Sequence, residues 1–227
     1  MAYDFISLVN DVNNRLNEVE LTSSNFATAT GYFNFAKDSV NSSLRHIQQE
    51  EYEWPWNHVE QSDVVIAGQV RYAIPSDAKT VNFNTFRIKR DDSLNVGTIH
   101  LKNMEYEEWL DKHVDSEYNT NSKGCPTHVI RTPSREYILY PNPDKAYEVV
   151  FEYFRVGYDL EQATDIPNLP EQYRYVIVDG AMYYVYQFRG DTPSANLALQ
   201  KFQQGIKHLR SLHINRTNNL RDTRVRF

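Results

Sequence analysis

The stretch LPEQYRYVIVDGAMYYVYQFRGD, residues 169–191, decides the fold, because its apolar residues have the spacing of a buried helix. They recur at intervals of three and four, which places them on one helical face. Pro170 and Glu171 suit a first helical turn, where one amide needs no partner and negative charge is favoured, and Gly190 ends the helix. The residues on the apolar face are Tyr173, Val176, Ile177, Gly180, Ala181, Tyr184 and Phe188. The small neighbours Gly180 and Ala181 predict a close approach by another helix.

A second helix follows this one directly. We expect Thr192 to cap it, with Pro193 at its first position. Its apolar residues recur in steps of four and three, as on a helix that lies along a partner. They are Ala195, Leu199, Phe202, Ile206, Leu209 and His213. The two segments therefore predict a helical hairpin, which indicates architecture and no chemistry.

Two amphipathic helices are predicted near the N-terminus, separated by the polar stretch LTSSNFATATG. The first has an apolar face of Phe5, Leu8, Val9, Val12, Leu16 and Val19. The second spans about residues 32–50 and has an apolar face of Phe33, Ala36, Val40, Leu44 and Ile47. Together with the later hairpin, these helices form a four-helix bundle if the middle of the chain is an insertion.

The middle of the chain is rich in short β-type runs, broken by Pro, Gly and Asn. These runs are VRYAIP, FRIKRD, GTIHLKN, THVIRT, EYILYP and YEVVFEYFRVG, and one short helix, residues 104–113, interrupts them. We therefore predict an α+β protein: a four-helix bundle from residues 1–53 and 158–213, an inserted antiparallel β domain from residues 54–157, and an extended C-terminal tail of residues 214–227.

Composition predicts a folded, soluble protein made in a cytoplasm. The 227 residues are 41% hydrophobic and include 16 Tyr, a residue that favours half-buried surfaces and interfaces. Cys125 is the single cysteine, so no internal disulfide can form. The sequence contains neither a run of about 18 apolar residues nor the layout of a signal peptide, so we expect no membrane contact.

The charge is unevenly distributed along the chain. Residues 214–227 hold four Arg and one Asp, which gives this segment a net charge of +3. Because the whole chain has a net charge of −6, the remaining residues together carry −9. An acidic body repels phosphate and argues against broad nucleic-acid binding. The basic tail can contact phosphate or an acidic partner.

Motifs for catalysis, cofactors or metals are absent from the sequence, and we predict no catalytic, cofactor-binding or metal-binding residues and no enzymatic activity. Neither GxxxxGK nor GxGxxG occurs. Cys125 between Gly and Pro is more simply a turn residue than a nucleophile, since a reactive thiol needs a base nearby. The acidic clusters EEYE (residues 50–53) and EYEEW (residues 105–109) are typical of solvated helix faces, and WPW (residues 54–56) of an aromatic plug.

The order of these segments resembles that of the head-to-tail adaptor, or head completion, proteins of tailed bacteriophages, especially short-tailed ones. The similarity covers about residues 3–213. It lies in VNDVNNRLNE, in LRHIQQEEYEWPW, in GCPTHVIRTPSREYILYPNPDKAYEVVFEYFR and in residues 169–191.

The resemblance implies a structural protein of the virion neck, assembled as a homo-oligomeric ring of twelve. Its implied partners are the portal protein, a downstream nozzle or tail tube protein, and DNA that passes without sequence-specific binding. It also implies that a C-terminal extension grips the portal. We assign this role to Ile214, Arg216, Leu220, Arg221, Arg224, Val225, Arg226 and Phe227.

Two other functions stay open at this point. One is a nucleic-acid-binding module that acts through the Arg-rich tail. The other is a carbohydrate-active protein that uses the Trp and carboxylate clusters, since paired carboxylates can cleave glycosidic bonds.

Overall fold

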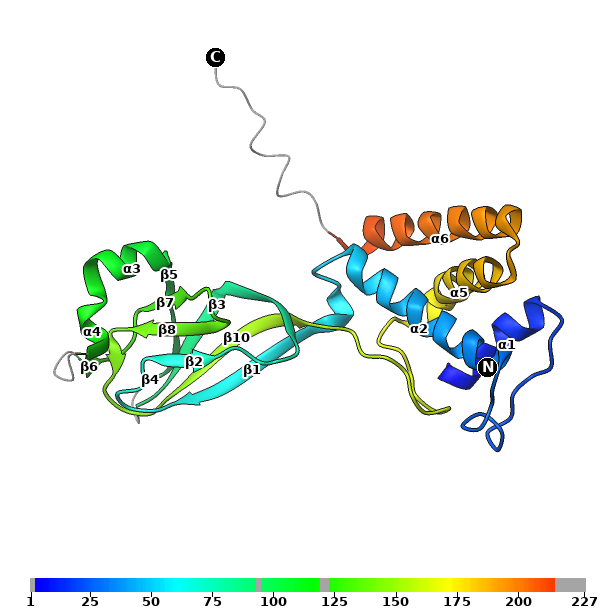
Figure 1. The fold of residues 1–227 in the computed structure, drawn as a ribbon. Helices are drawn as coiled ribbons and strands as arrows, with labels where there is room; N and C mark the ends of the chain where they lie inside the picture. Colours follow the sequence, from blue (N-terminus) through cyan, green and yellow to red (C-terminus); the bar gives the residue numbers. More distant parts are fainter. Residues whose placement is uncertain (1–2, 93–94, 119–122, 215–227) are drawn as a thin grey trace, which may run out of the picture. The chain divides into compact units, whose positions relative to one another are not determined.

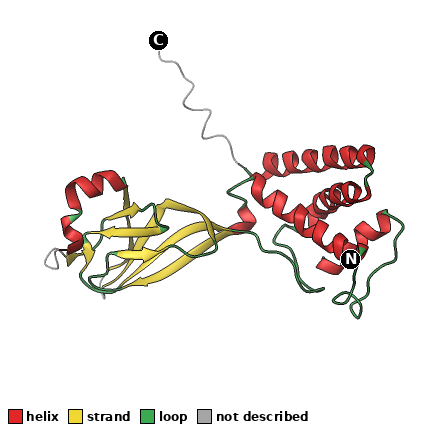
Figure 2. Ribbon diagram, in the orientation of Figure 1, coloured by secondary structure: helices red, strands yellow, loops and turns green. Residues whose placement is uncertain are grey.

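The computed structural model describes residues 3–92, 95–118 and 123–214, and the chain forms two compact units (Figure 1). The helical unit comprises Met1–Asn57 and Gly157–Phe227, and the β unit comprises His58–Val156. The fold is α+β: the N- and C-terminal helices pack together, and the central segment forms β-sheets (Figure 2). The boundaries fall after Asn57 and Val156, so the WPW motif belongs to the helical unit.

The helical unit is built from four long helices. They are α1 (Phe5–Arg15), α2 (Tyr32–Glu50), α5 (Arg174–Arg189) and α6 (Thr192–His213), with short 3₁₀ turns at Pro55–Asn57 and Glu171–Tyr173. Helix α5 packs against the other three, which places the segment chosen first from the sequence at the centre of this unit.

The predicted close approach at Gly180 is confirmed. A Cβ atom built there would lie 2.2 Å from Ser43 Oγ of α2 and 2.6 Å from a ring carbon of Phe202 of α6. On α6, Gly205 fits against Val176 of α5 in the same way, where a Cβ would lie 3.0 Å from a methyl carbon. Glycines therefore let the helices approach on both sides of α5.

Helix boundaries and faces differ from the prediction in three places. Helix α1 ends at Arg15, and Val19 lies outside it and is 75% exposed. The N-cap of α6 is Asp191, whose carboxylate accepts a hydrogen bond from the amide of Ser194 at 3.2 Å, so Thr192 is already helical. Phe188 is exposed despite its place in the α5 stripe, because the buried surface of α5 instead extends to Val178, Met182 and Val185.

The β unit contains two four-stranded sheets. The first has the order β1 (His58–Val65), β10 (Tyr147–Arg155), β3 (Ala78–Asp92), β4 (Asn95–His100), and all its pairs are antiparallel. The second has the order β2 (Arg71–Ala73), β8 (Glu136–Tyr140), β7 (His128–Arg131), β5 (Lys102–Met104). A two-stranded sheet pairs β6 (Lys123–Gly124) with β9 (Asn142–Pro143).

The expectation of a wholly antiparallel domain is wrong at two pairs of strands. Strands β5 and β7 are parallel, as are β6 and β9. Between β5 and β7 the chain passes through α3 (Tyr106–His113) and α4 (Asp115–Tyr118), a crossover long enough to return the chain in the same direction. The short predicted helix at residues 104–113 is thus the element that permits a parallel pair.

Aromatic side chains fill the space between the two large sheets. Phe86 of β3 stacks on Phe151 of β10 with ring centroids 4.6 Å apart, and Tyr137 of β8 meets Phe86 edge-on at 5.1 Å. Trp109 of α3 packs on Ile130 and Ile138, on the face of the second sheet opposite to this core. The layers of the β unit are therefore sheet, sheet and helix.

Candidate binding surfaces

The end of α6 is fixed by aromatic contacts within the helical unit. His213 shares a 2.7 Å hydrogen bond between its Nε2 and the hydroxyl of Tyr173, and its ring meets that of Trp56 edge-on at 5.4 Å. Trp56 stacks on the buried Trp54, whose indole N–H donates to the carbonyl of Ile47 at 2.8 Å. Side chains of the helical unit therefore hold the end of α6 in place.

Arg210 connects the end of α6 to the end of α2. Its guanidinium lies 2.9 Å from a carboxylate oxygen of Glu50 and 3.7 Å from one of Glu51. The carboxylates of Glu50 in α2 and of Glu51 directly after it therefore hold the last turn of α6 by opposite charge, beside the aromatic cluster of Tyr173, Trp56 and His213.

Of the eight residues predicted to bind a partner, the structure describes only Ile214. It is half-buried and has an extended backbone, and its amide donates to the carbonyl of Arg210 at 3.0 Å, so it caps the end of α6. The other seven lie outside the described residues: Arg216, Leu220, Arg221, Arg224, Val225, Arg226 and Phe227.

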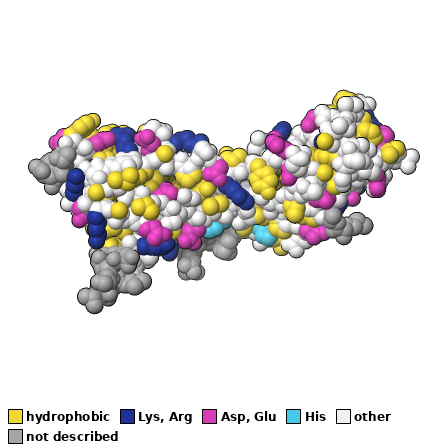
Figure 3. Space-filling view, turned by 90° about the horizontal axis from the view of Figure 1, so that it is seen from below, with side chains coloured by type: hydrophobic (Ala, Val, Ile, Leu, Met, Phe, Trp, Pro, Cys, Tyr) yellow, Lys and Arg dark blue, Asp and Glu magenta, His cyan; other side chains and the backbone are white. Residues whose placement is uncertain are grey.

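Helices α5 and α6 also carry large apolar side chains on their outer surfaces, and of these the periodicity of the sequence places only Phe188 on an apolar face. Phe188 is 61% exposed although its ring stacks on that of Phe35 at 4.1 Å. Tyr175, Leu197 and Leu212 are exposed as well. On the face shown in Figure 3, apolar side chains alternate with acidic and basic ones in each unit.

The residues that the sequence offered as candidates for catalysis or sugar binding, Cys125 and Trp54, pack against or within the hydrophobic cores. Cys125 is partly buried against the core of the β unit, beside Tyr147. Burial raises the pKa of the Tyr147 hydroxyl, which donates a 2.7 Å hydrogen bond to the carboxylate of Asp144. Trp54 is fully buried and cannot stack on a sugar.

The carboxylate clusters also form local contacts. Glu50 and Glu51 pair with Arg210 in the helical unit, whereas Glu108 of the β unit pairs with Lys112 one turn away at 2.8 Å. The Lys112 hydrogen bond holds the pKa of Glu108 below its usual value. Among the described residues, no group of three or more His, Cys, Asp or Glu side chains could hold a metal ion.

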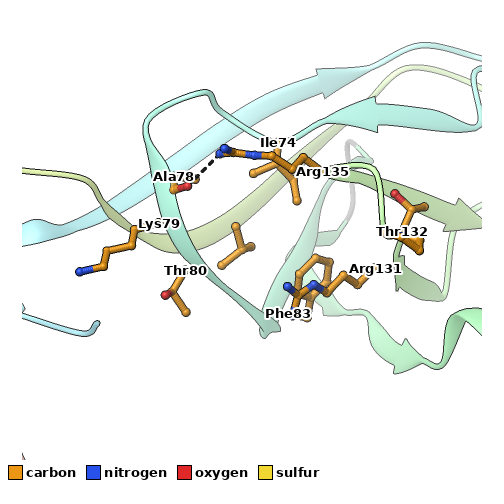
Figure 4. A pocket seen from close by; sticks show the side chains of 10 residues that line it. Ile74, Ala78, Lys79, Thr80, Phe83, Arg131, Thr132 and Arg135 are labelled. Atoms are coloured by element: carbon orange, nitrogen blue, oxygen red, sulfur yellow. Dashed lines mark hydrogen bonds between the residues drawn. The ribbon is translucent and has the colours of Figure 1, made fainter. Parts of the chain in front are cut away.

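The β unit contains a basic cavity that sequence reasoning missed (Figure 4). It has a volume of about 500 Å³ and lies beside the first residues of β3 and the turn that joins β7 to β8. Its lining residues are Ile74, Ala78, Lys79, Thr80, Val81, Phe83, Arg131, Thr132, Pro133 and Arg135. The only sequence signal was the pair of Arg residues that flank the turn TPS.

Arg135 is held in this cavity by an unusual backbone conformation. Its φ is +57°, a left-handed value that non-glycine residues seldom adopt. This places its guanidinium against the β2–β3 connection, where Nη2 donates to the carbonyl of Ala78 at 2.9 Å and lies 3.4 Å from those of Pro75 and Ser76. Arg131 lies over the Phe83 ring, 6.0 Å from its centroid.

No helix within residues 3–92, 95–118 and 123–214 has both the length and the apolar character needed to cross a membrane. The chain thus consists of a helical unit, in which side chains hold the end of α6, and a separate β unit. The chain belongs to the SU10 adaptor protein family, which it matches over residues 3–226. It is a structural adaptor of the phage head-to-tail junction and a virion protein, not an enzyme. No protein with a curated description matches it.

Proposed function

We propose that the protein forms a ring of twelve copies that docks on the portal protein, extends the DNA channel and offers a platform to a downstream nozzle or tail tube protein. The observation that carries this proposal is the basic segment after α6: residues 214–227 have a net charge of +3, against −9 for the rest of the chain. Membership of the adaptor family supports the location between head and tail.

In this proposal, residues 214–227 bind the portal. Fourteen residues reach at most about 45–50 Å when fully extended, enough to run along a neighbouring protein. The Arg side chains at 216, 221, 224 and 226 offer planar forks of donors to carboxylates. Ile214, Leu220, Val225 and Phe227 supply apolar anchors. The aromatic cluster at His213 fixes the position from which this segment starts, which reduces the entropy lost on docking.

The acidic body suits a channel through which DNA must move. A net charge of −9 outside the tail repels phosphate, so DNA passes without being held. Because the phosphate backbone supplies most non-specific affinity, a protein that lacks a broad basic surface binds DNA weakly.

The test is truncation after His213. The fixed end of α6 lies within the retained part, so the truncated protein is expected to fold with unchanged helix content but to lose co-purification with portal particles. Replacing Arg216, Arg221, Arg224 and Arg226 together by Lys is the matched control, because it retains the charge and removes the guanidinium forks.

Two outcomes would contradict the proposal. If the truncated chain binds portal particles as tightly as the intact one, the contact comes from the body of the protein. If the intact chain binds a short DNA duplex tightly and the truncated chain does not, the nucleic-acid-binding alternative is favoured instead.

A further inference from the structure

The basic cavity of the β unit is lined by cationic side chains, which favour an anionic ligand. Lys79, Arg131 and Arg135 surround it, whereas no carboxylate of the described residues lines it. In Figure 4 the Arg131 side chain lies alongside the Phe83 ring, and Arg135 reaches toward Ala78. Ile74 and Phe83 give the cavity an apolar wall beside these cations.

The two guanidinium charges of this cavity are not neutralised within the described part of the chain. Arg135 is satisfied by backbone carbonyls, and Arg131 by the face of an aromatic ring, and neither forms an ion pair with a described carboxylate. Several arginines outside the cavity differ, since Arg71 pairs with Glu117 at 2.7 Å, and Arg45 with Asp159 at 2.5 Å. A protein with an excess of carboxylates thus leaves these two guanidiniums available.

The ligand that fits is a polypeptide segment that carries carboxylates next to an apolar side chain. The apolar wall has no role in binding a phosphate backbone, and the acidic body disfavours nucleic acid. Guanidinium groups instead make paired hydrogen bonds with carboxylates, and the wall can bury a neighbouring side chain.

The chain itself presents such a segment, on α3 and α4. Packing of Trp109 on the second sheet turns Glu107, Leu110 and Asp111 outward, and all three are exposed. Glu105 and Asp115 are exposed at the two ends of α3. None of these four carboxylates forms an ion pair with a cation of the described residues.

We propose that the basic cavity of one copy receives the acidic α3–α4 surface of a second copy. The inference rests on the proposed ring and deepens it by naming two different surfaces of the β unit that meet between neighbours. A contact between two different patches is heterologous and closes into a ring when the rotation allows, whereas a symmetric patch would stop at a dimer. Arg131 of the cavity and Glu107 of α3 are both exposed, and we assign them to this contact.

The experiment counts copies of the full chain bound per portal particle and compares charge-reversal variants. Arg131→Glu and Glu107→Arg should each lower the apparent affinity of assembly by about tenfold, the cost of breaking one or more close charge pairs. The double variant should recover a substantial part of the loss, because it restores opposite charges across the contact. Arg87→Glu is the matched control: Arg87 is exposed on β3, outside the cavity, and this variant should assemble like wild type.

The outcomes separate this inference from the proposed function. If the wild-type chain binds particles as single copies, both the ring and this contact fail. If the wild-type chain forms rings and Arg131→Glu forms them equally well, only the contact is overturned. If Arg131→Glu loses binding to a short DNA duplex that wild type binds tightly, the cavity serves phosphate and the second-copy assignment is wrong. Rescue of assembly by the double variant, with unchanged circular dichroism of every variant, supports the contact between the basic cavity and the α3–α4 surface of a second copy.

Discussion

At the scale of single residues, Gly180 determines how closely three helices can pack. The side chains of Ser43 and Phe202 occupy the space in which a Cβ atom of residue 180 would lie. The surroundings are the core of the helical unit, so they cannot move apart without separating α5 from α2 and α6.

We expect Gly180→Leu to lower the free energy of unfolding by about 1–3 kcal/mol or more, because it overpacks this contact. Urea denaturation followed by circular dichroism measures the change. Gly97→Ala is the control, since a Cβ at that position meets no atom within 4 Å. An unchanged melting temperature for the Leu variant would mean that this face of α5 does not pack closely against α2 and α6.

The ion pair between Arg45 and Asp159 makes stability depend on pH. Hydrogen bonds of 2.8 and 2.5 Å from the guanidinium hold the pKa of the Asp159 carboxyl below its usual value. The charged form is therefore favoured by folding. This contribution is present above the unfolded pKa of about 3.9 and is lost as pH falls through the lowered folded pKa.

Asp159→Asn should accordingly be less stable than wild type at pH 7, and the difference should vanish once the pH has fallen below the lowered folded pKa of Asp159. Its size should be under about 1 kcal/mol, because the two side chains are 56% and 42% exposed and solvent screens the pair. Denaturant titrations of both proteins at several pH values measure it. A difference that stays constant with pH would show that the charge of residue 159 has no part in it.

At the scale of elements, the sequence predicted best those helices whose buried surface is a single apolar stripe. Helix α2 was predicted at its observed bounds, and β10 lies within the predicted β-type run YEVVFEYFRVG, with Tyr147, Val149, Phe151 and Tyr153 buried on one face. Helix α5 is surrounded by three helices, so its buried surface exceeds any single stripe. The parallel pairing of β5 with β7, and the basic cavity, depend on contacts between distant segments that periodicity does not encode.

The segment that returns from the β unit is attached to α2 by Asn41. Its side-chain amide donates to the carbonyl of Leu160 at 2.9 Å, and its side-chain oxygen accepts from the amide of Leu160 at 3.0 Å, in a buried position. One side chain thus satisfies both backbone groups of a residue outside any helix or strand.

Replacing Asn41 by Ala should cost about 2–3 kcal/mol, because it leaves a buried donor and a buried acceptor without partners. Thermal and urea unfolding of the full chain measure this loss. Asn14→Ala is the control, since Asn14 makes an exposed hydrogen bond to the Glu20 carboxylate and its loss should cost less than about 0.5 kcal/mol. Equal effects of the two substitutions would refute the assigned role of Asn41.

At the scale of the whole molecule, the β unit is inserted between two residues of the helical unit that lie close together, Asn57 and Gly157. The last residue before the insertion, Asn57, donates a hydrogen bond from its side-chain amide to Gln48 of α2. Gly157 directly follows the insertion, and a Cβ atom there would lie 2.6 Å from Cγ of the same Gln48. Both junctions therefore contact one side chain, which brings the two ends of the interrupted helical unit together.

This geometry predicts that the helical unit folds without the β unit. Replacing residues 58–156 by a Gly-Ser linker of about four residues spans junctions that are already close, so the loop-closure cost is small. The core of the helical unit loses no buried residue, because all residues of its hydrophobic cluster lie outside the deleted segment.

We expect this shortened protein to unfold cooperatively on heating and to show the helical circular dichroism of α1, α2, α5 and α6. Because the proposed docking segment follows α6, the shortened protein should still bind portal particles, while the contact between β units, and with it ring formation, should be lost. A protein that aggregates or lacks helix would show that the helical unit depends on the β unit for folding, and retained rings would place the contact between copies on the helices.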